Sequence, residues 1–317
     1  MTTTKKKHPA PRRAPAKRPP QRARSPRRPW WVWPVGAVIA LAVAGVLAAA
    51  LQPGGDSGSV PDEGLPRTPD YHSLLVAPSD ARTLLLGTHD GLFRSADGGR
   101  TWTKDALDGR DAMNLARPGR RVVWAAGHLV LARSADGGAT WEDVRPSGLP
   151  SLDVHGFAVD PRDAQRLYAA VAGEGLFRST DGGSSFELRS RDVGPGVMAL
   201  AVLPGGRILA GDMQRSLLAS SSDGGASWKG VVRASVMGLA VNPTRPRIVL
   251  ASGPGVLRST DGGRAWAQAL ELEAGSGPVA WSASEPDVAY VVGLDRSLWR
   301  SDDAGATWSK VVPGEEA

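Results

Sequence analysis

The sequence predicts an all-β protein: a six-bladed β-propeller of four-stranded blades, preceded by one transmembrane helix. Three observations predict it. An eight-residue string occurs six times, an apolar stretch stands at a near-constant distance before each copy, and a long uncharged run follows a basic N-terminus. With 41% hydrophobic residues, the 317-residue chain can bury a sizeable core. The absence of cysteine excludes a disulfide scaffold and Cys-ligated metal sites.

The N-terminal segment, residues 1–29, carries eleven Lys and Arg residues, seven prolines and no acid. Such a segment repels itself and buries nothing, so we expect a disordered basic tail. Subtracting its eleven charges from the net charge of +6 leaves residues 30–317 at −5. The high pI of about 10.0 therefore describes the tail, and it gives no reason to expect a nucleic-acid partner.

Residues 30–51 contain no charged side chain and begin with three tryptophans among four residues. As a helix these 22 residues would span about 33 Å, enough for a bilayer core, with the indole rings at headgroup level. The preceding cations predict a cytoplasmic N-terminus near anionic lipid and an exported remainder, periplasmic or extracellular, at the cell membrane. Ala48–Ala50 could serve a signal peptidase, but the long run favours an uncleaved signal-anchor. Residues 52–71, rich in Pro, Gly, Ser and Asp, are predicted to be a flexible linker.

The repeated string has Ser two positions before an Asp, Gly two positions after it and an aromatic residue five positions after it. Successive copies are 38 to 45 residues apart. The six Asp residues are Asp97, Asp136, Asp181, Asp223, Asp261 and Asp303. Glycine supplies positive φ in a hairpin, and the Asp and Ser side chains can bind the backbone of that turn. We therefore expect these residues to be structural.

Between the strings, the apolar runs are strand-sized and separated by turn residues. In the third unit, for example, they predict strands over 156–159, 166–172, 176–179 and 185–189. Four short strands repeated about every 41 residues are typical of propeller blades. The predicted domain is 72–313, followed by a short tail, 314–317, and its blades are 72–107, 111–145, 152–190, 195–233, 235–270 and 276–313.

The six strings resemble the Asp-box, or BNR repeat, Ser-x-Asp-x-Gly-x-Thr-Trp, over residues 72–313. With its basic tail and single anchor, the chain resembles small membrane-anchored bacterial proteins grouped with sialidase-like glycosyl hydrolases. Sortilin-type receptors and photosystem II assembly factors are more distant resemblances. The family implies that the boxes lie on the outer edge, opposite the functional face. The sialidase Arg-Ile-Pro signature is absent from the first blade, and Tyr168 and Tyr290 occupy a strand column typical of core packing.

The loops opposite the boxes are the best pointer to a site, because length varies most in the connections between blades. A glycosidase would need two carboxylates across a scissile bond. The candidate acids on these loops are Asp90, Asp111, Asp153, Glu174, Asp212 and Asp295. The candidate binding residues are His89, Arg110, His128, His155, Arg191, Arg215 and Arg296. His72 also falls on this face.

A His/Asp metal site on this face is conceivable, but solvated loop histidines without fixed spacing are the favoured interpretation. The sequence analysis thus expects neither a metal nor a cofactor. It favours a membrane-anchored binding or assembly module whose ligand is protein or glycan. The alternative is a glycoside hydrolase. A photosystem-type assembly factor is a third interpretation, which requires a phototrophic source.

Overall fold

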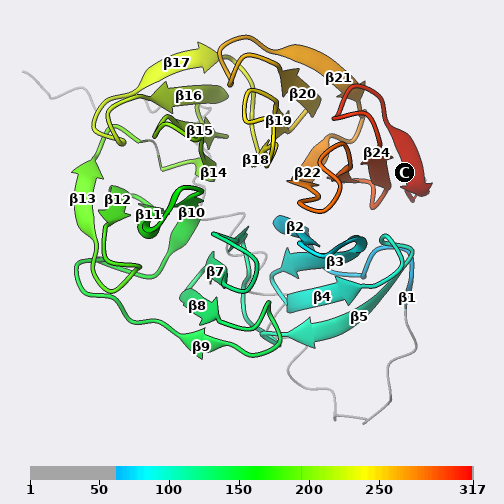
Figure 1. The fold of residues 1–317 in the computed structure, drawn as a ribbon, viewed down its shortest axis with the longest axis horizontal. Coiled ribbons are helices and arrows are strands. Elements are labelled where there is room, and N and C mark those ends of the chain that lie inside the picture. Colours follow the sequence, from blue (N-terminus) through cyan, green and yellow to red (C-terminus); the bar gives the residue numbers. More distant parts are fainter. Residues whose placement is uncertain (1–61, 194, 316–317) are drawn as a thin grey trace, which may run out of the picture. The chain divides into compact units, whose positions relative to one another are not determined.

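The computed structural model describes residues 62–193 and 195–315, which form six antiparallel sheets arranged as blades around a central axis (Figure 1). Each blade takes four consecutive strands of the chain, with the first strand at the centre of the ring and the fourth at its rim. The prediction of a six-bladed propeller with four-stranded blades is confirmed.

The strands of the first three blades alternate direction, and each pairs with its sequence neighbour. Blade one contains β2 (Ser73–Ala77), β3 (Asp80–Thr88), β4 (Gly91–Ser95) and β5 (Thr101–Ala106). Blade two contains β6 (Asn114–Ala116), β7 (Val123–Gly127), β8 (Val130–Ser134) and β9 (Glu142–Asp143). Blade three contains β10 (Val154–Asp160), β11 (Asp163–Val171), β12 (Gly175–Ser179) and β13 (Glu187–Ser190).

The remaining blades repeat this order. Blade four contains β14 (Val197–Val202), β15 (Ile208–Asp212), β16 (Leu217–Ser221) and β17 (Lys229–Val232). Blade five contains β18 (Gly238–Val241), β19 (Val249–Ser252), β20 (Gly255–Ser259) and β21 (Ala267–Glu271). Blade six contains β22 (Ser276–Trp281), β23 (Ala289–Gly293), β24 (Leu298–Ser301) and β25 (Ser309–Val312).

The core lies between neighbouring blades. Second strands such as β7, β15 and β23 are buried at every residue, because both of their faces are covered by the adjacent sheets. Outer strands such as β21 are largely exposed and carry polar residues. Each of the six hydrophobic clusters combines side chains from two consecutive blades, and one of them joins blade six to blade one. A single blade therefore cannot bury its own faces, and the closed ring is the folding unit.

The segment before the first blade corrects the predicted linker. β1 (Asp62–Glu63) pairs with β5 as a fifth strand of blade one, and the Gly64 N–H donates to the Arg100 carbonyl at 2.8 Å. Leu65 and Tyr71 are 1% and 4% exposed in the cluster that joins blades six and one. The Pro- and Gly-rich composition suggested a linker, but these two apolar side chains fix the segment at the ring closure.

The C-terminus is fixed at the same place. The Glu315 N–H donates to the Asp295 carbonyl at 2.8 Å, and Arg296 binds the Glu315 carboxylate at 2.8 Å and the Leu65 carbonyl at 2.6 Å. Residue 315, predicted to be in the tail, therefore joins the propeller. The predicted basic tail 1–29, the anchor 30–51 and the first part of the linker lie outside the described residues. Within the described part, no helix is long and apolar enough to cross a membrane.

Candidate functional site

The ring has two different faces, set by the antiparallel order of the strands. The turns between third and fourth strands carry the six Asp-boxes, and we call this side the box edge. The loops between second and third strands, and the connections from one blade to the next, open on the opposite side. We call that side the mouth.

On the box edge, each Asp carboxylate is used within its own turn. Asp97 Oδ1 accepts the N–H groups of Arg100 and Thr101 at 2.9 and 3.0 Å, and Oδ2 accepts the Thr101 hydroxyl at 2.7 Å. The Ser95 hydroxyl donates to Asp97 and accepts the Gly99 N–H, both at 2.8 Å. Partial burial opposes the shift, but these bonds to the charged form lower the pKa of Asp97 to about 2. The Asp97 carboxylate therefore serves to stabilise its own turn.

The other five boxes repeat this arrangement. In each, the Ser hydroxyl donates to the Asp and accepts the N–H of the Gly two positions after that Asp. The Asp Oδ1 atom accepts the N–H groups of the residues three and four positions after it. The pKa of each of these Asp carboxyls is lowered by the same kind of bonds. Since each of the six box carboxylates serves its own turn, none of them is free for chemistry.

Several predicted mouth residues are held locally or by a single neighbour. Asp212 Oδ1 accepts the Arg215 N–H at 3.0 Å, Asp295 binds Ser297, and Arg296 is bound at the ring closure. Glu174 lies 3.6 Å from Arg191, whereas Asp90 is exposed. Arg110 forms an ion pair with Asp143. These residues do not converge on one place.

Four histidines do converge, and with them two predicted acids. His72 stands directly before β2, and His89 lies in the loop between β3 and β4. Their Nε2 atoms are 3.1 Å apart, and each lies 3.0 Å from a different oxygen of Asp70. The sequence analysis missed Asp70 because it fell within the predicted linker.

A second group follows on blades two and three. His128, in the loop between β7 and β8, places Nδ1 at 2.6 Å from Asp153 Oδ1. His155, at the start of β10, places Nε2 at 3.1 Å from the same oxygen. The His128 and His155 rings meet edge to face, with 5.0 Å between their centres.

Asp111 lies between the two groups. Its Oδ2 is 3.0 Å from His89 Nδ1 and 3.7 Å from His128 Nε2, and the side chain is 9% exposed. Neither carboxylate oxygen has a well-aligned hydrogen bond among the described residues. The His89 and His128 rings stack on each other, with 6.1 Å between their centres. We call the seven residues the His/Asp cluster; they are Asp70, His72, His89, Asp111, His128, Asp153 and His155.

Charge contacts and burial shift the pKa of several groups in the cluster. Contacts with Asp111 and Asp70 raise the pKa of His89 to about 10, against the opposing effect of burial. Burial acts to raise the pKa of Asp70, but its contacts with His72 and His89 hold it well below the usual range. Burial lowers the pKa of His155. The expectation of separate, solvated histidines is therefore wrong, because the mouth loops of blades one, two and three bring the four side chains into contact.

The centre of the mouth is narrow. Met113, Met198 and Met237 line a space of about 70 Å³ beside His72. Such a volume admits a water or a single side chain but no sugar ring. A ligand of any size would therefore lie across the mouth.

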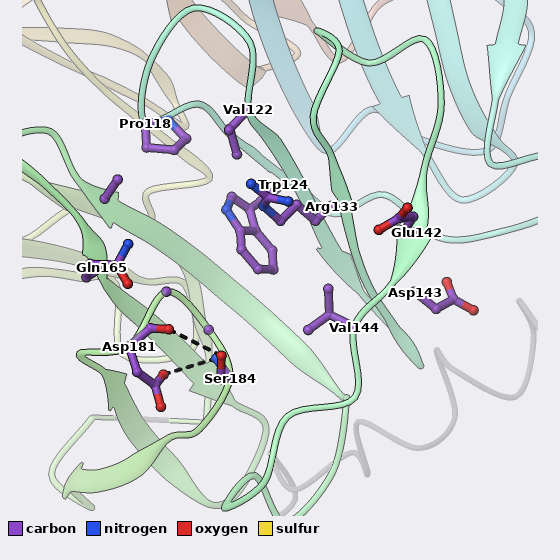
Figure 2. A pocket seen from close by; sticks show the side chains of 13 residues that line it. Pro118, Val122, Trp124, Arg133, Glu142, Asp143, Val144, Gln165, Asp181 and Ser184 are labelled. Carbon is purple, nitrogen blue, oxygen red and sulfur yellow. Dashed lines mark hydrogen bonds between the residues drawn. The ribbon is translucent and has the colours of Figure 1, made fainter.

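A larger hollow, of about 410 Å³, lies on the box side between blades two and three (Figure 2). Trp124, Arg133 and Glu142 line it together with the third Asp-box, where dashed lines in Figure 2 join Asp181 to Ser184. It exists because β9 has only two residues, after which the chain leaves to pair Ser147 with Ser185 of blade three. Asp181 is bound within its turn and Asp143 pairs with Arg110, and the lining of this hollow lacks the grouped histidines found at the mouth.

Comparisons with known proteins agree with the fold. The model of the family described as "Photosynthesis system II assembly factor YCF48" matches residues 74–316. No curated protein matches the chain.

Among solved structures, YCF48 bound to D1 peptide is 18% identical, with a TM-score of 0.51 over 82% of this chain and 88% of that one. The GH74 xyloglucanase from Xanthomonas campestris is 19% identical, with a TM-score of 0.55 over 81% of this chain and 46% of the enzyme. The GH74 enzyme from Niastella koreensis is 17% identical, with a TM-score of 0.52 over 75% and 46%. The chain thus spans less than half the length of these GH74 enzymes, and the similarity concerns the fold.

Proposed function

The chain belongs to the YCF48 assembly-factor family, and we propose that it is a membrane-anchored, extracytoplasmic binding module that holds a polypeptide across its mouth. The observation that carries the proposal is the contrast between the faces. The box edge uses its polar groups within its own turns, whereas the mouth gathers charged side chains that are not needed for any turn. Conspicuous polar groups on loops over a rigid scaffold are typical of binding sites.

The chemistry of the mouth suits a polypeptide. The methionines at its centre are flexible and polarizable, and such side chains adapt to irregular apolar partners. Leu129 and Leu294, which are 81% and 45% exposed, stand on mouth loops and add apolar contact surface. The relative solved with a bound peptide has the same fold over most of both chains.

The glycoside hydrolase alternative has less support. Sugar rings stack on exposed aromatic side chains, whereas Trp102, Trp124 and Trp281 are all under 9% exposed and belong to the blade packing. The acids nearest the mouth centre, Asp111 and Asp153, face histidines. Neither of these two carboxyls therefore lies in the apolar surroundings that a glycosidase acid typically has.

Photo-crosslinking from both faces tests where the ligand binds. A photoreactive amino acid replaces exposed Leu129 on the mouth or, as the matched control, exposed Ala226 on the box edge, in the full-length protein in its native membranes. We expect a discrete polypeptide adduct from position 129 and none from position 226. Equal adducts from both positions would contradict the proposal. So would hydrolysis of chromogenic glycosides by the purified protein that Asp111→Asn abolishes and Asp97→Asn leaves intact.

The anchor and export are proposed from residues 1–51, whose cations precede a 22-residue uncharged run. A phosphatase that is active only outside the cytoplasm, fused after Ala317, tests them. We expect phosphatase activity in the membrane fraction and loss of activity when residues 30–51 are deleted. An active fusion in the soluble fraction would show that the segment is cleaved. An inactive fusion of the intact chain would contradict export.

A further inference from the structure

We propose that the His/Asp cluster binds two divalent first-row transition-metal ions in adjacent sites. Asp70, His72 and His89 form the first site, and His128, Asp153 and His155 form the second. In each set, one ligand atom per residue can be chosen so that all three lie within 4.8 Å of one another. Two imidazoles with one carboxylate form a ligand set that such ions commonly use.

The first site has the dimensions of a coordination polyhedron. The Nε2 atoms of His72 and His89 are 3.1 Å apart, and each is 3.0 Å from an Asp70 oxygen. Ligand atoms bound tetrahedrally at 2.0–2.1 Å from zinc lie about 3.3 Å from one another. The contacts involve both Asp70 oxygens, so an ion placed among these four atoms could take one or both oxygens with only small shifts of its ligands. The three side chains are 12% to 38% exposed, so further coordination positions face the solvent.

The second site is built in the same way from two blades. Asp153 Oδ1 lies 2.6 Å from His128 Nδ1 and 3.1 Å from His155 Nε2. His155 Nε2 is a buried atom that, despite its contact with Asp153, makes no well-aligned hydrogen bond in the described part of the chain. A buried nitrogen of this kind is costly unless something binds it. A metal ion would satisfy it.

Asp111 supports both sites from between them. It approaches His89 at Nδ1 and His128 at Nε2, in each case the ring nitrogen that the proposed site does not use. Proteins commonly place a carboxylate at the second nitrogen of a metal-binding histidine, which fixes the ring and increases its basicity. Because Asp111 is nine-tenths buried and lacks aligned donors, its charge is met by these two rings.

The charge balance of the cluster also favours cations. Asp70, Asp111 and Asp153 form ion pairs with histidines, and within residues 62–315 no Lys or Arg pairs with them. Four imidazoles make the donor set too rich in nitrogen for Ca²⁺ or Mg²⁺, which prefer oxygen. Zinc and cobalt are therefore suitable probes.

Titration calorimetry and native mass spectrometry of the chelator-treated, full-length protein in detergent test the proposal. We expect two Zn²⁺ per chain. His72→Ala and His155→Ala should each leave one, and the double variant should leave none. Asp111→Asn should weaken zinc binding 10- to 100-fold, as loss of an outer carboxylate does elsewhere. The matched controls are Asp90→Asn and Glu174→Gln, mouth acids outside the cluster, which should bind zinc as the unaltered protein does.

Thermal unfolding without metal shows whether each variant is folded, and His72→Gln and His155→Gln replace any alanine variant that is not. Zinc binding that survives in the double variant would overturn the proposal, as would no zinc binding by the unaltered protein. A single ion lost in both single variants would contradict two separate sites. Co²⁺ gives an independent readout, since three protein ligands in a low-symmetry site should produce visible absorption that the double variant lacks.

Discussion

The box edge and the mouth are made by the same repeat, yet they follow opposite rules. At the box edge, six copies of one hydrogen-bond pattern consume every Asp and Ser of the motif, as the contacts of Asp97 illustrate. At the mouth, the blades differ, and buried polar atoms such as those of Asp111 lack aligned donors. The residues that repeat in every blade therefore stabilise the ring, and the residues that differ between blades form the surface available to a ligand.

Among single substitutions, the largest effect is expected where a box glycine touches a neighbouring blade. Gly99 has φ +91°, and a Cβ there would lie 2.1 Å from the fully buried Leu298. Gly99→Ala should lower the free energy of unfolding by about 2–4 kcal/mol through overpacking and backbone strain. Gly137 has φ +87° but open space around it, so Gly137→Ala should lower the free energy of unfolding by about 1–2 kcal/mol. Denaturant unfolding of both variants checks the difference, and equal costs would show that the contact between blades does not matter.

Zinc should stabilise the ring from the mouth side. Ligand bound only by the folded state at 100 times its dissociation constant adds about 2.7 kcal/mol per site. We therefore expect zinc to raise the melting temperature of the unaltered protein and to leave that of the His72→Ala/His155→Ala variant unchanged. Mg²⁺ serves as the control ion and should shift neither. A zinc shift of the same size in both proteins would place the stabilising ion elsewhere.

Removing the hydroxyl of a box serine should lower the free energy of unfolding by less than replacing Gly99 with alanine does. Ser95 is 1% exposed, and its hydroxyl satisfies both Asp97 and the Gly99 N–H. Ser95→Ala leaves these groups unpaired and should lower the free energy of unfolding by about 1–3 kcal/mol. Ser151→Ala, at an exposed mouth position, should change it by less than about 0.5 kcal/mol. Comparable losses in denaturant unfolding would contradict the division between the faces.

The smallest effect concerns one box at acid pH. The folded-state pKa of Asp97 is about 2, below the ordinary value of 3.8, so its contribution is complete above about pH 4. That contribution is lost as the pH falls toward 2. The melting temperature should therefore fall across this window, and Asp97→Asn should fall less steeply while being less stable at pH 7. A variant with the same pH slope as the unaltered protein would show that this carboxyl does not stabilise the fold through its charge.

The fold was accessible from sequence because its determinants are local. The box glycines and serines act within one turn, and the apolar runs of the third unit predicted strands that overlap β10 to β13, with ends differing by up to three residues. The His/Asp cluster could be predicted only in part from the sequence. His89, His128 and His155 could be placed on one face, but their approach depends on how three blades close around the axis. Asp70 was missed because composition hid the anchoring role of Leu65 and Tyr71.

Anomalous X-ray scattering from crystals of the protein grown with zinc, collected at the zinc edge, shows directly whether the His/Asp cluster binds two ions. We expect two peaks at the mouth, one contacted by His72, His89 and Asp70 and the other by His128, His155 and Asp153. We expect none at the Asp-box carboxylates, which are bound within their turns. Zinc peaks at the box edge with an empty mouth would contradict both proposed sites.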